Sequence, residues 1–369
     1  MPVRVLHVLP ALSGYGAERQ VANLVPLLQS PDLTAGVLTI YRRPQTDAEE
    51  KTYPVLDCGR VKRSDYLFLH RLVARIREFK PDIVHAHTHA GKYWARAAAV
   101  LAGVPALVYT EHNPCDPRRN GVERLIDPVL HRMTQRIVTF FGEQRRALSL
   151  RDRVPIEKIV TIPNGLFLNT SAEPAANLRE RLHLRADRYA VLVVGRLEFQ
   201  KNQQLALRAL ARYEAGKNAQ PHLYFAGGGS DEDSLRELAR ELAIEERVSF
   251  LGYRGDVHEL MAASDAVLMT SHFEGMPLTL IEAMLAGTAI VSTPWTGVRE
   301  MLDDGRMGFI TSGWEPADVA ETLARALQSS GARTAMVQRA RAYVEQNYSI
   351  TRMAQRHAAL YADLAGAHA

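Results

Sequence analysis

The sequence predicts an α/β protein with two Rossmann-like domains, each a parallel sheet with helices on both faces. Short apolar, β-branched runs alternate with helical patterns along the chain, and continuously apolar strands separated by helices are typical of parallel sheets. The alternation occurs twice, because a polar, helix-forming stretch near residues 171–188 separates two series of strands. A length of 369 residues agrees with two domains.

The predicted elements follow this order along the chain. The first series of strands is Val3–Leu9, Gly36–Ile40, Ile83–His87, Ala106–Thr110, Ile137–Phe141 and Ile159–Ile162. The second series is Ala190–Val194, Leu223–Ala226, Val248–Leu251, Ala266–Thr270, Ala289–Ser292 and Gly308–Ile310. Expected helices include 19–28, 231–243 and 256–263, and the chain is helical from Pro316 with a weak break near Tyr348. We therefore expect domains at 1–170 and 171–345, with a last helix in 346–369 that packs back toward the first domain.

Composition and charge indicate a globular protein and exclude several other classes. Hydrophobic residues make up 47% and charged residues 23%, which excludes a disordered or fibrous chain. No apolar run reaches the roughly 18 residues of a membrane span, and residues 1–10 lack the long apolar core of a signal peptide. Cys58 and Cys115 match no zinc or CxxC spacing, so we expect a reducing, cytoplasmic setting. Residues 1–170 hold 24 Lys and Arg against 16 Asp and Glu, a net +8, and the remainder is net −4, which indicates different partners for the two halves.

A glycine-rich turn follows the first strand. Gly14 and Gly16 permit a tight turn, and the amides of the next helix can receive an anion. A dinucleotide fingerprint is one alternative, but Arg19 occupies the place of its third glycine and Arg42-Arg43 stand where an NAD site wants an acidic residue. We favour a phosphate or sugar contact, with a purely structural turn as the other alternative.

Histidines occupy two strand ends of the first domain. His85, His87 and His89 alternate, so all three share one face if the strand continues. A metal site is conceivable, but no acidic residue or cysteine follows at a familiar ligand spacing. Hydrogen-bonded strand-end histidines and a polar lining for an acceptor are the alternatives. His112 follows the next strand and is expected at the same carboxyl edge, where ligands of open parallel sheets bind.

The second domain carries charged residues at two strand ends. Gly195, Arg196 and Lys201 lie between a strand and a helix, an arrangement that favours anion binding. Glu274 stands in the loop before a later helix, whose first turn fits Pro277, and Glu282 stands within that helix. These carboxylates could be helix-dipole partners or could bind hydroxyl groups, and their spacing does not choose between the two.

Taken together, the motifs resemble those of the retaining glycosyltransferases of family 4, which have the GT-B fold. The matching segments appear in the family's order over residues 3–311: Gly14-x-Gly16-Ala17-Glu18, Thr110-Glu111-His112, Ile162-Pro163-Asn164-Gly165, Gly195-Arg196 with Lys201-Asn202, Gly227-Gly228-Gly229, Leu251-Gly252, and Glu274-Gly275-Met276-Pro277 with Glu282-Ala283. The resemblance implies two Rossmann-like domains facing across a cleft, with the acceptor on the first and the nucleotide-sugar donor mainly on the second.

The resemblance also assigns roles to residues. It implies that Arg196 and Lys201 bind the donor diphosphate, that Glu274 contacts the transferred sugar and Glu282 the ribose, and that His112 lies beside the reacting sugar. The other donor-binding residues it implies are Gly14, Gly16, Asn164, Gly195, Gly228, Tyr253, Arg254, Gly275, Met276, Pro277 and Leu278. The match at residues 253–254 is loose, and Tyr15 replaces the second consecutive glycine of many members.

The activity implied is that of a hexosyltransferase of class EC 2.4. Its donor would be a UDP or GDP sugar and its acceptor a glycan or lipid-linked molecule, in the synthesis of surface polysaccharide, lipopolysaccharide or glycolipid. No essential metal is expected, and Asp231-Glu232-Asp233 is interpreted as the start of a helix capped by Ser230. The alternatives are a dinucleotide-dependent oxidoreductase and a non-catalytic nucleotide-sugar-binding protein of the same fold.

Basic residues of the first half suggest a membrane surface as a further partner. In residues 65–80, cations interleave with apolar residues, as on a helix that lies on an anionic bilayer. A second cluster comprises Arg118, Arg119, Arg124, Arg132 and Arg136. The hypothesis is peripheral attachment to the inner face of the cell membrane, and the alternative is ordinary helices with solvated cationic faces. A nucleic-acid partner is not expected, because the charge is modest and no recognition motif occurs.

Overall fold

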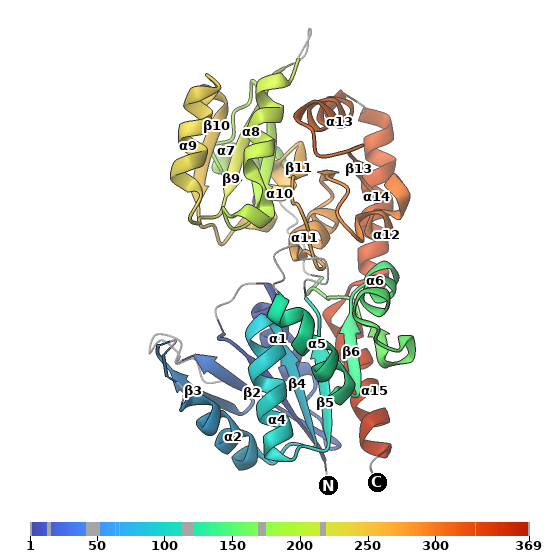
Figure 1. The fold of residues 1–369 in the computed structure, drawn as a ribbon. Helices are drawn as coiled ribbons and strands as arrows, with labels where there is room; N and C mark the ends of the chain where they lie inside the picture. The colour runs from blue at the N-terminus through green and yellow to red at the C-terminus, as the bar shows by residue number, and fades with distance from the viewer. Residues whose placement is uncertain are drawn as a thin grey trace. The chain divides into compact units, whose positions relative to one another are not determined.

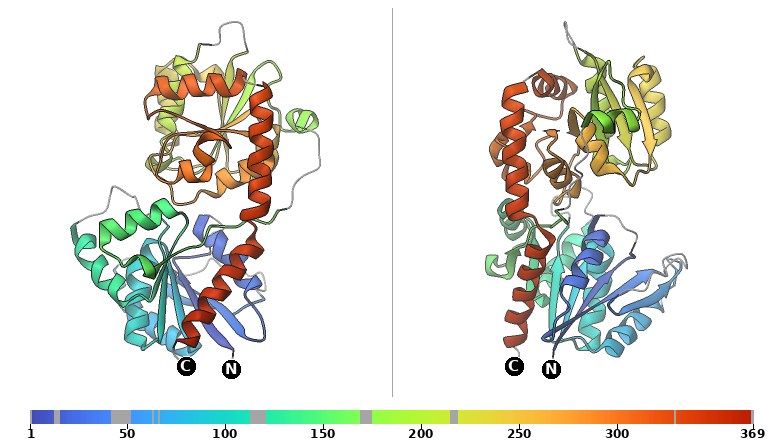
Figure 2. Two further views of the ribbon diagram at one scale, coloured as in Figure 1. Left: turned by 90° about the vertical axis from the view of Figure 1, so that its right-hand side faces the viewer. Right: turned by 180° about the vertical axis from the view of Figure 1, so that it is seen from behind.

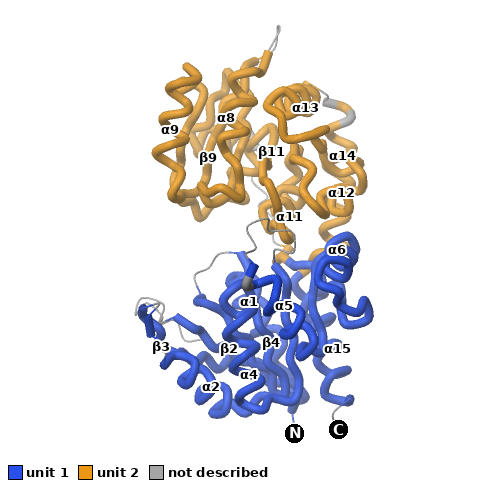
Figure 3. The backbone as a smooth tube through the Cα atoms, in the orientation of Figure 1, with its two compact units in different colours: residues 1–165, 350–369 blue, residues 166–349 orange. Residues whose placement is uncertain are grey.

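The structure is a computed structural model with two compact units (Figure 3). It describes residues 2–12, 16–41, 52–62, 64–65, 67–112, 121–168, 175–214, 219–328 and 330–367. Unit 1 contains residues 1–165 and 350–369, and unit 2 contains residues 166–349. The sequence analysis places the boundaries at residues 170 and 345; the structure places them at 165 and 349. Both chain termini belong to unit 1.

Unit 1 is built on a parallel sheet of seven strands in the order β3-β2-β1-β4-β5-β6-β7. The strands are β1 (Val3–Leu9), β2 (Leu33–Tyr41), β3 (Val55–Arg60), β4 (Ile83–His87), β5 (Ala106–Thr110), β6 (Arg136–Thr139) and β7 (Ile159–Thr161). The order reverses at β1 and β4, which are neighbours although they are far apart in the chain. His7 of β1 stands in register with His85 of β4, so these two side chains leave the same face of the sheet.

Helices cover both faces of this sheet (Figures 1 and 2). Apolar residues of α1 (Gly16–Leu27) and α15 (Ile350–Gly366) pack on one face, and those of α2 (Phe68–Phe79), α4 (Arg96–Ala102) and α6 (Gly142–Asp152) pack on the other. The remaining helical segments are α3 (Thr88–Ala90), the π-helical turn η2 (Gly91–Ala95), α5 (Gly121–Met133) and η3 (Ile156–Lys158). The last helix of the chain therefore belongs to the first unit, where it packs against α1 and β1.

Unit 2 has a second parallel sheet, of six strands in the order β10-β9-β8-β11-β12-β13. The strands are β8 (Tyr189–Val194), β9 (Pro221–Ala226), β10 (Val248–Gly252), β11 (Ala266–Met269), β12 (Ala289–Ser292) and β13 (Phe309–Ile310). β8 lies between β9 and β11, so the loops that follow β8 and β11 begin at the same edge of the sheet. This adjacency positions the charged residues described below.

The helices of unit 2 complete its core. A buried cluster joins β8, β9 and β11 to α8 (Gln203–Arg212), α9 (Glu232–Glu241) and α13 (Pro316–Gln328). Contacts also join α10 (Val257–Ala263) to β8, and α11 (Leu278–Ala286) and α14 (Ser330–Asn347) to β12. The shorter helical segments are α7 (Ala175–Arg181), η4 (Phe199–Lys201), η5 (Glu245–Arg247), α12 (Val298–Met301) and η6 (Asp303–Gly305).

The structure confirms the predicted α/β class with two parallel sheets and corrects several details. The sequence analysis missed the strand β3, and α1 begins at Gly16 rather than at residue 19. The predicted break after Asn347 separates α14 from α15. Ser230 does not cap α9: the N-cap is Asp231, and the Ser230 hydroxyl donates to the Asp231 carboxylate at 2.9 Å.

The proposed membrane-facing role of residues 65–80 is wrong. The apolar side chains of α2, including Leu72, Val73 and Ile76, are buried against the sheet of unit 1. The apolar face of α2 is therefore part of the core of unit 1 and is not available to a membrane. Its cations lie on the solvent-exposed side of the helix. Among the described residues, the structure contains no helix with the length and hydropathy needed to cross a membrane.

Candidate active site

Two loops of unit 2 bring opposite charges together at the carboxyl edge of the sheet. Lys201 ends the short turn η4 that follows β8, and Glu274 lies in the loop between β11 and α11. Because β8 and β11 are adjacent parallel strands, both loops start from the same edge. The Lys201 Nζ atom lies 2.7 Å from Glu274 Oε1.

Three side chains fix the carboxylate of Glu274, which is only 5% exposed. Lys201 pairs with Oε1, and the Ser271 hydroxyl donates to the same oxygen at 2.6 Å. The Gln200 amide donates to Oε2 at 3.2 Å and to the carbonyl of Phe273, also at 3.2 Å. The carboxylate is thus held in one orientation beside a cation, a preorganised arrangement for binding a polar ligand.

Glycines in the neighbouring loops allow close backbone approach. A side chain on Gly227 would overlap the carbonyl oxygen of Gly195, and one on Gly229 would overlap that of Leu197. Gly195 and Gly227 also have φ values of +141° and +144°, which favour glycine. Gly228, in contrast, has open space around its Cα, so packing does not require a glycine there.

Two predicted donor-binding arginines are engaged elsewhere. The Arg196 guanidinium pairs with Glu198 at 2.9 Å, and its side chain is 61% exposed. Arg254 makes two hydrogen bonds to the carboxylate of Asp256, at 2.8 and 2.6 Å. Tyr253 beside it is 73% exposed. The structure therefore brings Lys201 to Glu274, whereas Arg196 and Arg254 pair with neighbouring carboxylates and Tyr253 is largely exposed.

The segment between Glu274 and α11 leads directly into a helix N-terminus. Pro277 is the N-cap residue and lies just before the helix, rather than in its first turn as expected. Gly275, Met276 and Leu278 are buried, and Glu282 is the fifth residue of α11, where it is partly exposed. First-turn amides of a helix carry the positive end of its dipole, which favours a bound anion.

The predicted histidine cluster of unit 1 forms with different members. β4 ends at His87, so His89 leaves the strand and pairs with Glu123 at 2.7 Å instead of sharing the face of His85 and His87. His7 of the neighbouring strand β1 takes its place, with its Nδ1 atom 3.0 Å from Nε2 of His87. The sequence analysis missed His7 because a single histidine in an apolar strand carries no motif.

Both ring nitrogens of His85, in this histidine cluster, take part in hydrogen bonds. His85 interacts through one nitrogen with the Tyr361 hydroxyl at 2.6 Å and through the other with the Thr110 hydroxyl at 2.7 Å. Nitrogen atoms of His7, His85 and His87 lie within 4.8 Å of one another, close enough to share a cation. The bonds to Tyr361 and Thr110 occupy both nitrogens of His85, so the geometry fits a hydrogen-bonded network better than a metal site.

Burial keeps these imidazoles neutral. Desolvation lowers the pKa of His7 to about 3 and that of His112 to about 4, and it lowers the pKa values of His85 and His87 well below the usual range. No described residue hydrogen-bonds to Nε2 of His112, whose ring lies 5.8 Å from that of His87. A neutral imidazole with an unused nitrogen can donate to or accept from a ligand hydroxyl.

The other predicted residues of unit 1 lie at loop ends. Gly16 begins α1 with a φ of +44°, and Asn164 is buried in the segment after β7. The neighbouring Gly165 amide donates to the Gln20 side chain of α1 at 3.2 Å, so this segment and α1 are joined. Gly14 lies outside the described residues.

Comparisons with known proteins place the chain in a family. Residues 175–343 match the model for glycosyl transferases group 1, and residues 15–169 match the model for glycosyltransferase family 4. The protein described as glycosyltransferase EpsF of Bacillus subtilis is 31% identical over 341 residues, which cover 88% of this chain and 87% of EpsF. The chain belongs to glycosyltransferase family 4. It is therefore a glycosyltransferase, and the oxidoreductase alternative is wrong.

A further relative agrees with this glycosyltransferase assignment, and solved structures show the fold. An Escherichia coli protein named UDP-Gal:alpha-D-GlcNAc-diphosphoundecaprenol alpha-1,3-galactosyltransferase is 28% identical over 327 residues, covering 84% of each chain. The Anabaena HepE structure matches with a TM-score of 0.85 at 22% identity, covering 98% of this chain and 100% of HepE. WaaG, a glycosyltransferase involved in lipopolysaccharide biosynthesis, matches with a TM-score of 0.78 at 18% identity, covering 97% and 99% of the two chains. These likenesses show the GT-B fold.

Proposed function

We propose that this glycosyltransferase moves a hexosyl group from a nucleotide-diphosphate sugar to a glycan or lipid-linked acceptor, with retention of the anomeric configuration. The observation that carries the proposal is the Lys201–Glu274 pair, 2.7 Å apart and beside the N-terminus of α11. A fixed cation and a helix terminus suit a diphosphate, and a fixed carboxylate suits sugar hydroxyls.

The chemistry requires a leaving group that accepts negative charge. As the glycosidic bond breaks, charge grows on the diphosphate oxygens, and Lys201 with the first-turn amides of α11 would stabilise it. Arg196 would join them by exchanging Glu198 for phosphate. That exchange costs little, because the pair is solvent-exposed and such pairs contribute at most about 1 kcal/mol.

Glu274 would position the transferred sugar while the acceptor attacks from the face of the leaving group. Glu282 would bind the nucleotide ribose, and the backbone of Gly275, Met276, Pro277 and Leu278 would contact sugar and phosphate. His112, neutral at pH 7 because burial lowers its pKa to about 4, would contact the reacting sugar as a hydrogen-bonding group rather than as a cation. Gly14, Gly16, Asn164, Gly195, Gly228, Tyr253 and Arg254 complete the proposed set of donor contacts.

The acceptor class rests on the relatives. The name of the E. coli relative specifies a UDP-galactose donor and a lipid-diphosphate acceptor, and family 4 resemblance implies surface polysaccharide, lipopolysaccharide or glycolipid synthesis. We propose a pathway of that kind for this chain, with a UDP sugar as the first donor to test and a GDP sugar as the second.

Substitution of the central pair tests the proposal. Lys201→Met and Glu274→Gln keep the side-chain size and remove one charge each, so we expect turnover to fall by at least about 100-fold in each variant. Arg236→Ala, which removes an exposed cation paired with Glu232 on α9, is the matched control and should retain normal turnover. Near-normal turnover in both site variants would refute the assignment.

The anomeric configuration of the product tests retention. It is read by nuclear magnetic resonance, and an inverted linkage would exclude retention.

Turnover should not need a divalent metal, because protein cations and helix amides would take the diphosphate charge. We expect wild-type turnover to be unchanged after exhaustive treatment with EDTA. A loss of more than about tenfold that added Mg²⁺ restores would show that a metal supplies this stabilisation instead.

A further inference from the structure

Helix α5 of unit 1 turns four apolar side chains outward, while its Leu130 is buried. Leu125 is 77% exposed, Val129 59%, and Ile126 and Met133 41% each. These four residues recur at spacings of three and four, so they form one continuous stripe along the helix. A stripe of that kind normally faces a protein core.

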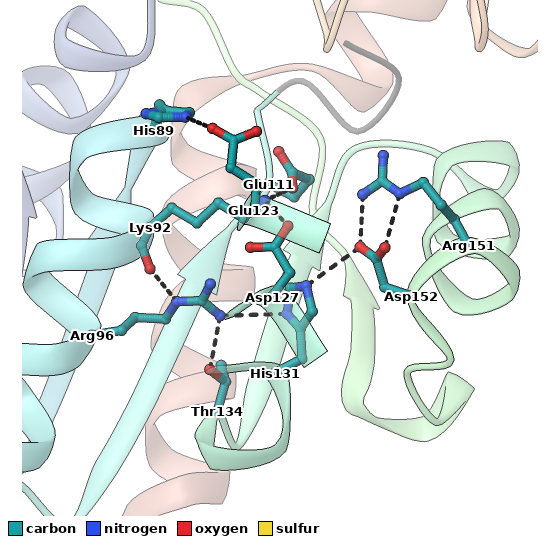
Figure 4. Close-up of polar contacts among 10 residues, drawn as sticks. All are labelled: His89, Lys92, Arg96, Glu111, Glu123, Asp127, His131, Thr134, Arg151 and Asp152. Carbon is teal, nitrogen blue, oxygen red and sulfur yellow. Dashed lines mark hydrogen bonds and ion pairs between the residues drawn. The ribbon is translucent and has the colours of Figure 1, made fainter. Parts of the chain in front are cut away.

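The opposite side of α5 is polar and faces inward (Figure 4). Asp127, His131 and the following Thr134 are all buried. Lys92 of η2 lies 2.7 Å from the Asp127 carboxylate, and Arg96 of α4 contacts His131 at 3.4 Å and donates to the Thr134 hydroxyl at 3.2 Å. A network of buried charges therefore holds α5 to the rest of unit 1.

Further polar contacts extend this network and hold α5 in its present orientation about the helix axis. The His131 ring lies 3.4 Å from the carboxylate of Asp152, which Arg151 also contacts at 2.8 Å. Rotation of α5 to bury its apolar stripe would break these contacts and would separate the buried Asp127 carboxylate from Lys92. Separating the partners of a buried ion pair is strongly destabilising, because neither charge regains the solvation that it has in water. The outward stripe is thus a stable feature of the fold.

The charges beside the stripe are positive. Arg124 and Arg132 of α5 are exposed, and Lys158 caps the helix end by donating to the carbonyl oxygens of Arg132 and Thr134, both at 3.1 Å. The two acidic residues of α5 are engaged by unit 1 itself, Glu123 with His89 and Asp127 with Lys92. An apolar stripe flanked by cations, without exposed carboxylates on the same helix, is complementary to an anionic lipid bilayer.

We propose that α5 docks unit 1 on an anionic membrane surface, with Leu125, Ile126, Val129 and Met133 in the acyl boundary and Arg124 and Arg132 at the headgroups. This inference rests on the proposed function in one respect: docking would bring the acceptor-side unit to a lipid-linked acceptor. It assigns the membrane contact to α5 and not to α2, whose apolar face is buried.

Vesicle flotation of the full-length protein, without donor or acceptor, tests the apolar contact. We expect the wild type to float with vesicles of phosphatidylcholine and phosphatidylglycerol and to bind pure phosphatidylcholine much more weakly. Leu125→Asn combined with Val129→Asn should lower the partition coefficient by about tenfold or more, because two apolar side chains no longer enter the bilayer. Leu67→Asn combined with Leu101→Asn, which changes two exposed leucines elsewhere in unit 1, is the control and should bind as the wild type does.

A second pair of variants tests the charge contact. Both change exposed arginines, so a loss of binding in them does not come from misfolding of the core. Arg124→Gln and Arg132→Gln should each weaken binding to the anionic vesicles by about fivefold, and added salt should do the same. Equal flotation of all variants, or equal binding to neutral and anionic vesicles, would overturn the proposal. So would a wild-type dimer that the Leu125→Asn and Val129→Asn changes dissociate, since the stripe would then bind a second copy. Donor turnover with a water-soluble acceptor is measured in the wild type and in the same variants. Variants that keep turnover but lose flotation support the docking proposal, because they are folded and active. A wild type that has turnover but does not float overturns the docking proposal alone and leaves the proposed function standing.

Discussion

Glu274 shows how single contacts define this site. Its carboxylate accepts hydrogen bonds from Ser271, Gln200 and Lys201, so each oxygen already has a partner before any ligand arrives. The sequence pointed to Glu274 and Lys201 through a motif, but it did not point to Ser271 or Gln200. A serine and a glutamine in loops are common, and only the adjacency of β8 and β11 shows that they meet one carboxylate.

The glycines of the same edge give a prediction at this scale. Gly227→Ala should destabilise the protein by at least about 2 kcal/mol, because the new methyl group would overlap the Gly195 carbonyl and φ is unfavourable for alanine. Gly228→Ala should change stability by less than about 1 kcal/mol, since its Cα faces open space. Urea unfolding measures both, and equal effects would contradict the packing described here.

Buried polar groups, as well as apolar packing, hold the helices α5 and α15 in place in unit 1. α15 contributes Tyr361 to the histidine network of β1 and β4, and α5 is bound through Asp127 and His131. The sequence does not reveal these partners, because they lie up to 354 residues apart in the chain. The amphipathic pattern alone pointed to α2 as a membrane-facing helix, but the apolar face of α2 packs against the sheet of unit 1.

The buried histidines predict a pH dependence of stability. The pKa of His357 in α15 is lowered to about 4 by burial, whereas an unfolded histidine titrates near 6.5. Between these two values the unfolded chain binds more protons than the folded one, so stability falls as the pH falls from 6.5 toward 4. His357→Leu should reduce the slope of the unfolding free energy against pH by about 1.4 kcal/mol per unit in this window. Urea titrations at several pH values measure the slope, and an unchanged slope would show that His357 is not linked to folding in this way.

The ion pair between η2 and α5 gives a second prediction for elements. Lys92→Met should destabilise the protein by about 3–5 kcal/mol, because it leaves Asp127 buried without the lysine charge. Adding Asp127→Leu should recover part of that loss, because it removes the nearer of the two buried carboxylates beside Lys92, while Glu111 at 3.7 Å stays buried. Thermal unfolding of the single and double variants gives the coupling, and purely additive losses would contradict a buried pair.

At the scale of the whole molecule, much of the fold was predictable. Continuously apolar strands separated by helices indicated two parallel sheets, and ordered motifs indicated a family 4 glycosyltransferase. The edge strand β3 was missed because Val55–Arg60 contains aspartate, glycine and arginine, which are rare in central parallel strands. Arg196, Tyr253 and Arg254 occupy positions that bind the donor in the family the sequence resembles. The sequence did not reveal that Arg196 pairs with Glu198, that Arg254 pairs with Asp256, or that Tyr253 is largely exposed.

Ligand binding should stabilise the molecule according to the nucleotide. At about 100 times its dissociation constant, the nucleotide of the true donor should add roughly 2.7 kcal/mol to the free energy of unfolding. We expect this shift from UDP or GDP, and we expect Lys201→Met to abolish it. Thermal unfolding with UDP, GDP and ADP measures the shift, and NAD serves as the control that should produce none.

The structure of the enzyme with an intact nucleotide-diphosphate sugar tests the central claim most directly. We predict that the diphosphate lies against Lys201 and the N-terminus of α11, and that Glu274 contacts the sugar. A donor whose phosphates bind away from these residues would contradict the account.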